Sequence, residues 1–316
     1  MAARSDESLA ALLLTQRLVE TSVPPLKASE YWSVVDRVDD LGVLLSGDAA
    51  AVARAARVEA DLAERIAALL DAATAVAFEL DQKEQSGLRV VASVDDAYPA
   101  RLVERLGRSA PPLLYVIGDA ALLGPALFGV VGSRDVGEAA GAVARDAAAE
   151  AVRNGFGVVS GGAKGIDRLA MGSALAAGGV AVAVLADSLE RTVRDAEIRR
   201  IVGEGRLCLC TPYKPTAGFS VANAMGRNKL IYALSQATLV VTSDLETGGT
   251  WAGAQEALRQ KTCAVLVWSG DGAGAGNEKL VELGADAVAA VDALFPLPAP
   301  PARTVAPPAS QLAMDV

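Results

Sequence analysis

The stretch from Leu127 to Leu175 contains, twice in succession, a short apolar run, a polar glycine-rich turn and a segment of helical composition. The first apolar run ends at Gly132-Ser133-Arg134, and the second ends at Ser160-Gly161-Gly162-Ala163-Lys164-Gly165. Such βαβ units place their turns at the carboxyl edge of a parallel sheet, where ligands bind. Glycines let backbone N–H groups approach an anion closely, and the following helix contributes its positive end. Because one turn carries Arg134 and the other Lys164, the pattern indicates one site for a phosphate-bearing ligand.

The same alternation continues on both sides of this stretch and predicts an α/β fold. Short apolar runs separated by helical segments of about ten to fifteen residues are typical of a Rossmann-like, doubly wound and mostly parallel sheet. The expected strands outside the central stretch are Leu88–Ala92, Val180–Ala186, Leu207–Cys210, Ala237–Thr242 and Thr262–Trp268, and the expected helices include Gly137–Asn154, Leu189–Val202 and Trp251–Arg259.

The remaining segments suggest three parts. Residues 1–86 predict a small helical domain, because Leu residues recur at helical spacing near the start and residues 49–80 form a long Ala-rich stretch with one apolar side. Residues 87–292 carry the Rossmann-like pattern. Residues 293–316 are rich in Pro and Ala, a composition that predicts a disordered or polyproline-like tail.

Composition excludes several classes of function. The chain contains no histidine, which removes Ser–His–Asp and Cys–His catalysis and the commonest zinc ligand. Its three cysteines are too few for a disulfide framework, and we expect Cys208 and Cys210 to be buried as small hydrophobic residues. No apolar run approaches the roughly 18 residues that a membrane-spanning helix needs. Acidic residues precede the short N-terminal apolar run, which argues against a secretory signal, so we expect a cytoplasmic protein.

The net charge of −9 is unevenly distributed along the chain. Residues 1–100 contain 17 acidic and 9 basic residues, whereas residues 101–316 contain 21 and 20. The acidity therefore belongs to the N-terminal part, where direct contact with nucleic acid is not expected. The nearly neutral glycine-rich part leaves room for a local basic groove.

Taken together, these motifs resemble the DNA-processing protein A family (DprA, also called Smf). Ser160 to Asp167 is similar to the most distinctive motif of that family, and Val131 to Arg134 is similar to its first phosphate-side loop. Further matching segments are Tyr98-Pro99 with Pro111-Pro112 and Tyr115–Gly118, then Arg227-Asn228-Lys229-Leu230-Ile231 with Leu234-Ser235, and Thr247-Gly248-Gly249-Thr250. The resemblance covers roughly Leu88 to Gly284, with its motifs in the family's order.

The resemblance implies a non-enzymatic protein that binds single-stranded DNA and delivers it to the recombinase RecA, notably during natural transformation. It further implies a homodimer, with no cofactor, no metal and no membrane association. The cations at the glycine-rich turns point to the same type of site, since a single strand needs a cationic groove that follows its backbone. The expected DNA- or phosphate-binding residues are Gly132, Ser133, Arg134, Ser160, Gly161, Gly162, Lys164, Gly165, Arg227, Asn228, Lys229, Thr247, Gly248, Gly249 and Thr250.

Individual residues of this set have different expected roles. Asp167 is expected to brace the loop rather than to contact the ligand, because a carboxylate repels phosphate. Arg227 and Lys229 lie two apart on a helix and therefore on different faces, so only one is expected to face the ligand, and we favour Arg227. Asn228 is expected to hydrogen-bond loop backbone, and Thr247–Thr250 either cap a helix or contact the ligand. Tyr213 and Phe219 are candidates for base stacking, whereas Trp251 and Trp268 are expected in the core.

Two other functions remain open from the sequence. Gly248-Gly249-Thr250 with Glu256 partly matches the Pro-Gly-Gly-x-Gly-Thr-x-x-Glu motif of phosphoribohydrolases that resemble lysine decarboxylases. A sensor domain that binds a small nucleotide is the other alternative. A dinucleotide oxidoreductase is disfavoured, because no G-x-G-x-x-G opens the domain.

Overall fold

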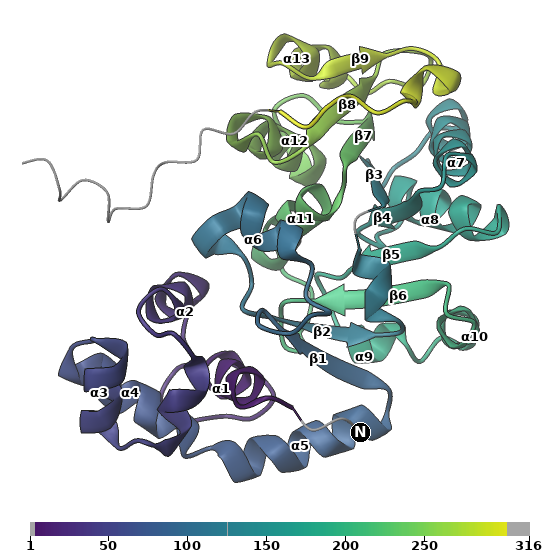
Figure 1. The fold of residues 1–316 in the computed structure, drawn as a ribbon. Helices are drawn as coiled ribbons and strands as arrows, with labels where there is room; N and C mark the ends of the chain where they lie inside the picture. Colours follow the sequence, from purple (N-terminus) through teal and green to yellow (C-terminus); the bar gives the residue numbers. More distant parts are fainter. Residues whose placement is uncertain (1–3, 125, 302–316) are drawn as a thin grey trace, which may run out of the picture.

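A computed structural model describes residues 4–124 and 126–301. Its N-terminal part is a group of short helices, drawn in purple and blue in Figure 1. These are α1 (Asp6–Thr15), α2 (Ala28–Val35), the 3-10 helix η1 (Leu41–Ser46), α3 (Ala49–Ala56), α4 (Ala60–Leu70) and α5 (Ala73–Gln85).

The helical stretch predicted for residues 49–80 is divided into α3, α4 and the first half of α5. Arg57 ends α3 in the left-handed conformation (φ 51°), and Glu59 precedes α4 with extended backbone. The resulting turn folds α3 back on α4, so that Val52 and Ile66 join one small core. A single straight helix could not enclose such a core, which explains the break.

One mixed sheet of nine strands organises the rest of the described chain, in the order β1-β2-β6-β5-β4-β3-β7-β8-β9. The edge strand β1 (Leu88–Ala92) pairs antiparallel with β2 (Leu113–Ile117), and β2 pairs antiparallel with β6. All pairings from β6 to β9 are parallel. The parallel strands are β3 (Leu127–Gly132), β4 (Gly157–Ser160), β5 (Ala181–Val184), β6 (Leu207–Thr211), β7 (Ala237–Thr242), β8 (Ala264–Trp268) and β9 (Asp286–Val288).

Helices cover both faces of the sheet, as Figure 1 shows. One face packs on α7 (Glu138–Arg153), α8 (Ile166–Ala176) and α10 (Ala196–Gly203). The other face packs on α6 (Ala100–Leu106), α11 (Val221–Leu234), α12 (Gly248–Gln260) and α13 (Asn277–Glu282). This arrangement confirms the predicted α/β, Rossmann-like fold with a mostly parallel sheet.

Strand order reverses at β3, and this reversal positions the site. From β3 the chain moves through β4, β5 and β6 on one side, and it returns to the other side with β7 and β8. The carboxyl ends of β3 and β7 therefore face a crevice that neighbouring connections leave open, which is where α/β sheets bind ligands.

Local differences from the prediction are small. The charged helix expected over Leu189–Val202 is interrupted, giving α9 (Leu189–Thr192) and α10. Asp195 caps α10 by accepting hydrogen bonds from the N–H groups of Glu197 and Ile198, which starts a new helix at that point. The short edge strand β9 was not expected from the sequence. Cys208 and Cys210 lie buried on one side of β6, as predicted, and burial raises the pKa of both thiols.

The N-terminal helices pack on the antiparallel edge of the sheet. Leu12 of α1 and Leu80 of α5 belong to one apolar core. Leu88 of β1 and Tyr115 of β2 belong to the same core. The Tyr115 hydroxyl accepts a hydrogen bond of 2.8 Å from the Arg17 backbone N–H. The segment after α1 is therefore held against β2.

The structure corrects the start of the predicted tail. Leu294 is buried, and Phe295 lies against Phe128 and Phe156 with ring centroids 5.4 and 5.3 Å away. The packed chain thus continues through Leu297, because these apolar side chains cover the end of the core. Residues 302–316 of the predicted tail lie outside the described residues.

Candidate functional site

The two glycine-rich turns predicted from the repeat lie against each other. The Ile166 N–H, at the start of α8, donates to the Ser133 carbonyl at 3.3 Å. Gly165 has a φ of 90°, and a Cβ there would lie 2.5 Å from the Ser133 carbonyl oxygen. Only glycine combines this backbone conformation with so close an approach. The turn after β3 and the turn after β4 therefore form one surface at the carboxyl edge of the sheet.

A cavity of about 770 Å³ opens beside this surface. Its lining comes from the turn after β3, from α11 and from the start of α12. The lining residues that the sequence had indicated are Gly132, Ser133, Arg134, Asp167, Phe219, Arg227, Asn228, Thr247, Gly248, Gly249 and Thr250. The charged residues in the lining are two arginines, Arg134 and Arg227, and four acids, Asp135, Asp167, Asp244 and Glu246.

Arg227 is the buried cation of this cavity. Its side chain is about 6% exposed, and its Nη1 lies 3.8 Å from Oδ2 of Asp167. Both Nε and Nη1 are buried and lack a hydrogen-bond partner within residues 4–124 and 126–301. Burial lowers the pKa of Arg227, although the nearby Asp167 carboxylate works in the opposite direction. Arg227 therefore has two N–H donors with unused hydrogen-bonding capacity beside the cavity, a feature that suits an anionic ligand.

Asp167 ties the β4 turn to Arg227. Its carboxylate accepts hydrogen bonds from the backbone N–H groups of Gly161 (3.1 Å) and Ala163 (3.4 Å). Burial raises the pKa of Asp167, and the Arg227 charge opposes that shift. Gly161 is required here because a Cβ would lie 1.3 Å from Nη1 of Arg227. The geometry is that of a brace between the turn and α11.

Arg134 and Phe219 form a pair at the exposed part of the cavity. The Arg134 guanidinium carbon lies 5.0 Å from the centroid of the Phe219 ring, a cation–π geometry. The Phe219 side chain is about half exposed. An aromatic face beside a phosphate-binding cation is the combination that a nucleotide recognises through its base and its backbone.

The start of α12 forms a further wall of the cavity. Thr247 is the N-cap residue, but its side chain makes no capping hydrogen bond within the described chain. The Asn228 side-chain amide donates to the Gly249 carbonyl at 3.0 Å and joins α11 to α12. The hydroxyl and backbone N–H groups of this turn therefore border the cavity at the positive end of a helix.

Several predicted site residues lie elsewhere. Lys229 does not line this cavity, and its Nζ pairs with Glu256 at 2.9 Å. Ser160 is buried and donates its hydroxyl proton to the Val130 carbonyl at 2.6 Å, so it joins two strands. Lys164 is exposed on the β4 turn, outside the cavity lining but next to Ala163, which belongs to it. Trp251 and Trp268 are buried in the core, as predicted, and Trp251 also contributes to the lining of this cavity.

Tyr232 and three lining acids, Asp135, Asp244 and Glu246, were not predicted from the sequence. Tyr232 lies on α11 with a buried hydroxyl that has no hydrogen-bond partner among the described residues, and burial raises its pKa well above the ordinary value. Its spacing of five from Arg227 gave no signal, because a tyrosine inside an apolar helix is usually a core residue. Asp244 and Glu246 follow β7 and come into the lining only through the strand order.

The fold and the site define a class of protein: a Rossmann-like domain with paired glycine-rich turns beside a cavity suited to a nucleotide anion. Residues 89–297 match the model of the DNA recombination-mediator protein A family. The chain belongs to this family.

Three similar proteins support this assignment. A DprA-type protein of Mycobacterium tuberculosis is 30% identical over 232 residues, which cover 68% of this chain and 58% of the relative. The crystal structure of DprA from Streptococcus pneumoniae superposes with a TM-score of 0.61 at 22% identity, covering 84% of this chain and 96% of that one. DprA from Helicobacter pylori, for which a single-stranded DNA binding mode is described, superposes with a TM-score of 0.54 at 22% identity, covering 65% and 93%.

The chain spans less than two thirds of the Mycobacterium tuberculosis relative that it matches. The two superposed structures share its fold. In residues 4–124 and 126–301, no helix combines the length and apolar character needed to cross a membrane.

Proposed function

We propose that this protein binds single-stranded DNA at the cavity between the β3 turn, α11 and α12, and that it acts in DNA recombination without catalysing a reaction. The observation that carries the proposal is the buried Arg227 with two unpartnered nitrogens, beside the exposed Arg134–Phe219 pair. A phosphate group of the strand would accept hydrogen bonds from the Arg227 guanidinium, and a base would stack on the Phe219 ring.

The proposal extends to partners. We further propose that the bound strand is delivered to a RecA-type recombinase and that the protein assembles as a homodimer. Family membership and the resemblance of the motifs support both. The single-strand binding described for the Helicobacter pylori relative supports the choice of ligand. Sequence-independent binding suits this role, because stacking and phosphate contacts do not read bases.

The position of Glu256 weighs against the phosphoribohydrolase alternative. In the partial motif Glu256 would have to share a site with Gly248 and Gly249. Instead its carboxylate pairs with Lys229 of α11 at 2.9 Å, and Glu256 is absent from the lining of the cavity. Glu256 is therefore not placed to act on a ligand bound at the glycine-rich turns.

Fluorescence-anisotropy titration with oligo-dT of several lengths and at several salt concentrations tests the proposal. We expect the double variant Arg134→Ala/Lys164→Ala to lose affinity and to flatten the salt dependence by about 0.7 for each lost phosphate contact. Phe219→Ala should weaken binding by about 1–3 kcal/mol for a stacked base, with an unchanged salt slope.

The matched control is Arg54→Ala/Arg194→Ala. It removes the same charge from two exposed arginines that lie outside the lining of the cavity. The control should bind like the wild type. Absence of binding to any oligonucleotide at low salt would refute the proposal, and turnover of nucleoside monophosphates would favour the hydrolase instead.

A further inference from the structure

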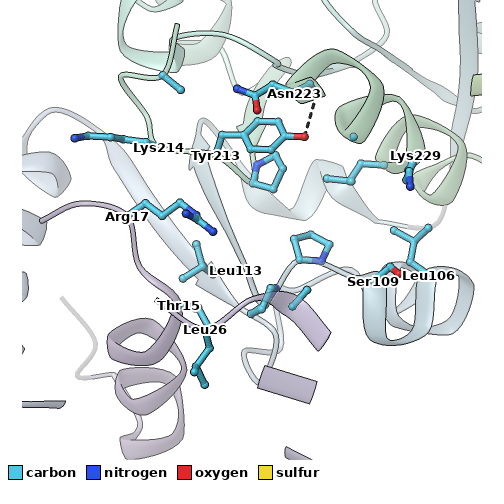
Figure 2. A pocket seen from close by; sticks show the side chains of 17 residues that line it. Thr15, Arg17, Leu26, Leu106, Ser109, Leu113, Tyr213, Lys214, Asn223 and Lys229 are labelled. Carbon is cyan, nitrogen blue, oxygen red and sulfur yellow. Dashed lines mark hydrogen bonds between the residues drawn. The ribbon is translucent and has the colours of Figure 1, made fainter. Parts of the chain in front are cut away.

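A second cavity, of about 580 Å³, lies between the N-terminal helices and the Rossmann-like domain (Figure 2). Arg17 reaches it from the segment after α1, and Lys214 and Lys229 come from the linker after β6 and from α11. The ring of Tyr213 forms part of the wall, and its hydroxyl donates to the Asn223 carbonyl at 2.9 Å. Prolines contribute the apolar surface: Pro111, Pro112 and Pro212.

The charge of this cavity is of one sign. All charged residues in its lining are cations, whereas the Arg227 cavity contains twice as many acids as arginines. Arg17 and Lys214 are exposed, and no ion pair of either is found within the described residues. Such a concentration of positive charge is unexpected in a chain of net charge −9, most of which lies in the N-terminal part that supplies Arg17. It marks a surface for an anionic ligand.

Both unpaired cations project from fixed backbone. The Arg17 N–H is held by the Tyr115 hydroxyl, and the Lys214 carbonyl accepts from the Ala217 N–H at 2.8 Å. Tyr213 is held to α11 through its hydroxyl. The backbone that carries the two cations, and the aromatic ring, are therefore held in place without a ligand, which lowers the entropic cost of ordering this part of the chain on binding.

The two cavities lie on opposite sides of α11. Asn223, Gly226 and Lys229 recur every three residues and face the second cavity, while Ala224, Arg227 and Ile231 face the first. A helix with its side chains is about 10 Å across, so a chain of a few nucleotides can pass from one cavity to the other over the first turn of α11. That turn also presents the positive end of the helix.

We propose that single-stranded nucleic acid leaving the Arg134–Phe219 site crosses α11 and that Arg17, Lys214 and Lys229 bind its next phosphates in the second cavity. This inference rests on the proposed function and extends it. It gives the N-terminal helical part a direct role in strand binding, against the expectation from its acidic composition. The group bound in the second cavity is a phosphodiester of the same nucleic acid strand.

The test compares short and long oligo-dT, of about 4 and 16 nucleotides, the range over which single-strand sites commonly extend. We expect Arg17→Ala/Lys214→Ala to bind the short strand like the wild type and to bind the long strand more weakly. Its salt slope with the long strand should fall by about 1.4, or 0.7 for each of two contacts. Arg17→Lys/Lys214→Arg should restore the slope, and Arg54→Ala/Arg194→Ala is again the charge-matched control.

The outcomes are separable. An unchanged salt slope of the double alanine variant with the long strand overturns the inference and leaves the proposed function intact. In a second outcome, the salt slope of the variant is unchanged, and inorganic phosphate raises the melting temperature of the wild type but not of the variant. This outcome assigns the cavity to a free anion and also overturns the inference. Failure of the wild type to bind even the short strand overturns both proposals.

Discussion

The buried pair of Arg227 and Asp167 allows a double-mutant cycle that tests the architecture of the site. The variants are Asp167→Asn, Arg227→Met and the two combined. Each single substitution leaves one buried charge without its opposite, and the double variant leaves neither. Because the two side chains are only about 6% and 10% exposed, solvent screening is weak.

The magnitude follows from the geometry. At 3.8 Å and an effective dielectric constant of about 20, the attraction between two unit charges is about 4 kcal/mol. Desolvation opposes it, since burial alone shifts the pKa of each group toward the neutral form. Asp167→Asn should destabilise the protein by about 3–5 kcal/mol, because an uncompensated buried cation remains. Arg227→Met should cost less, since two backbone N–H groups still donate to the carboxylate.

Urea denaturation of the four proteins, followed by tryptophan fluorescence, measures the coupling. We expect the double variant to be more stable than the sum of the single effects by about 2–3 kcal/mol, with similar m-values throughout. Effects of the two single substitutions that add to within about 0.5 kcal/mol would show that the pair does not act as a unit. In that case the brace between the β4 turn and α11 would have to be rejected.

Two other predictions concern the loop and the N-terminal helices. Gly161→Ala places a methyl group against the Arg227 guanidinium and should destabilise the folded protein by about 1–3 kcal/mol. Gly172→Ala, where a methyl group on α8 meets open space, should leave the stability unchanged or raise it. The melting temperatures of the two variants test this difference. Arg65 donates a hydrogen bond to Glu30 at 2.9 Å and lowers the pKa of the Glu30 carboxyl. The pair should therefore stabilise the folded protein by about 0.2–1 kcal/mol at a pH above 4.5, the ordinary pKa of the group. This stabilisation is lost as the pH falls through the lowered pKa of the folded state. Glu30→Gln should therefore lower the melting temperature at pH 7, and this loss should shrink as the pH falls through the lowered pKa of Glu30; a loss that stays constant over an acid titration would contradict this assignment.

The sequence was sufficient to predict most of the strands but not the order in which they pair. The runs that became β3, β4 and β7 were visible because a buried parallel strand is a short apolar run ending in a polar turn. The pairing of β3 with β7 was not visible, since their separation along the chain is bridged by three other strands. The acids Asp244 and Glu246 enter the cavity for that reason alone.

The cations show the same division. Helical periodicity correctly separated Arg227 from Lys229, because positions two apart on a helix point in different directions. It could not show that Arg227 would be buried with unpartnered nitrogens, which depends on Gly161 of a distant turn making room for it. That Lys229 lines one cavity together with Arg17 and Lys214 depends on how the N-terminal helices pack against β2.

The sequence by itself determined the fold class, the two glycine-rich turns and their family, because these depend on local periodicity and on the conformational freedom of glycine. Only the tertiary structure decided which charged groups face one another, which of them stay unpaired, and that α11 separates two cavities. Those features arise from contacts between residues far apart in the chain, and the distance-dependent energies of such contacts leave no periodic signal in the order of amino acids.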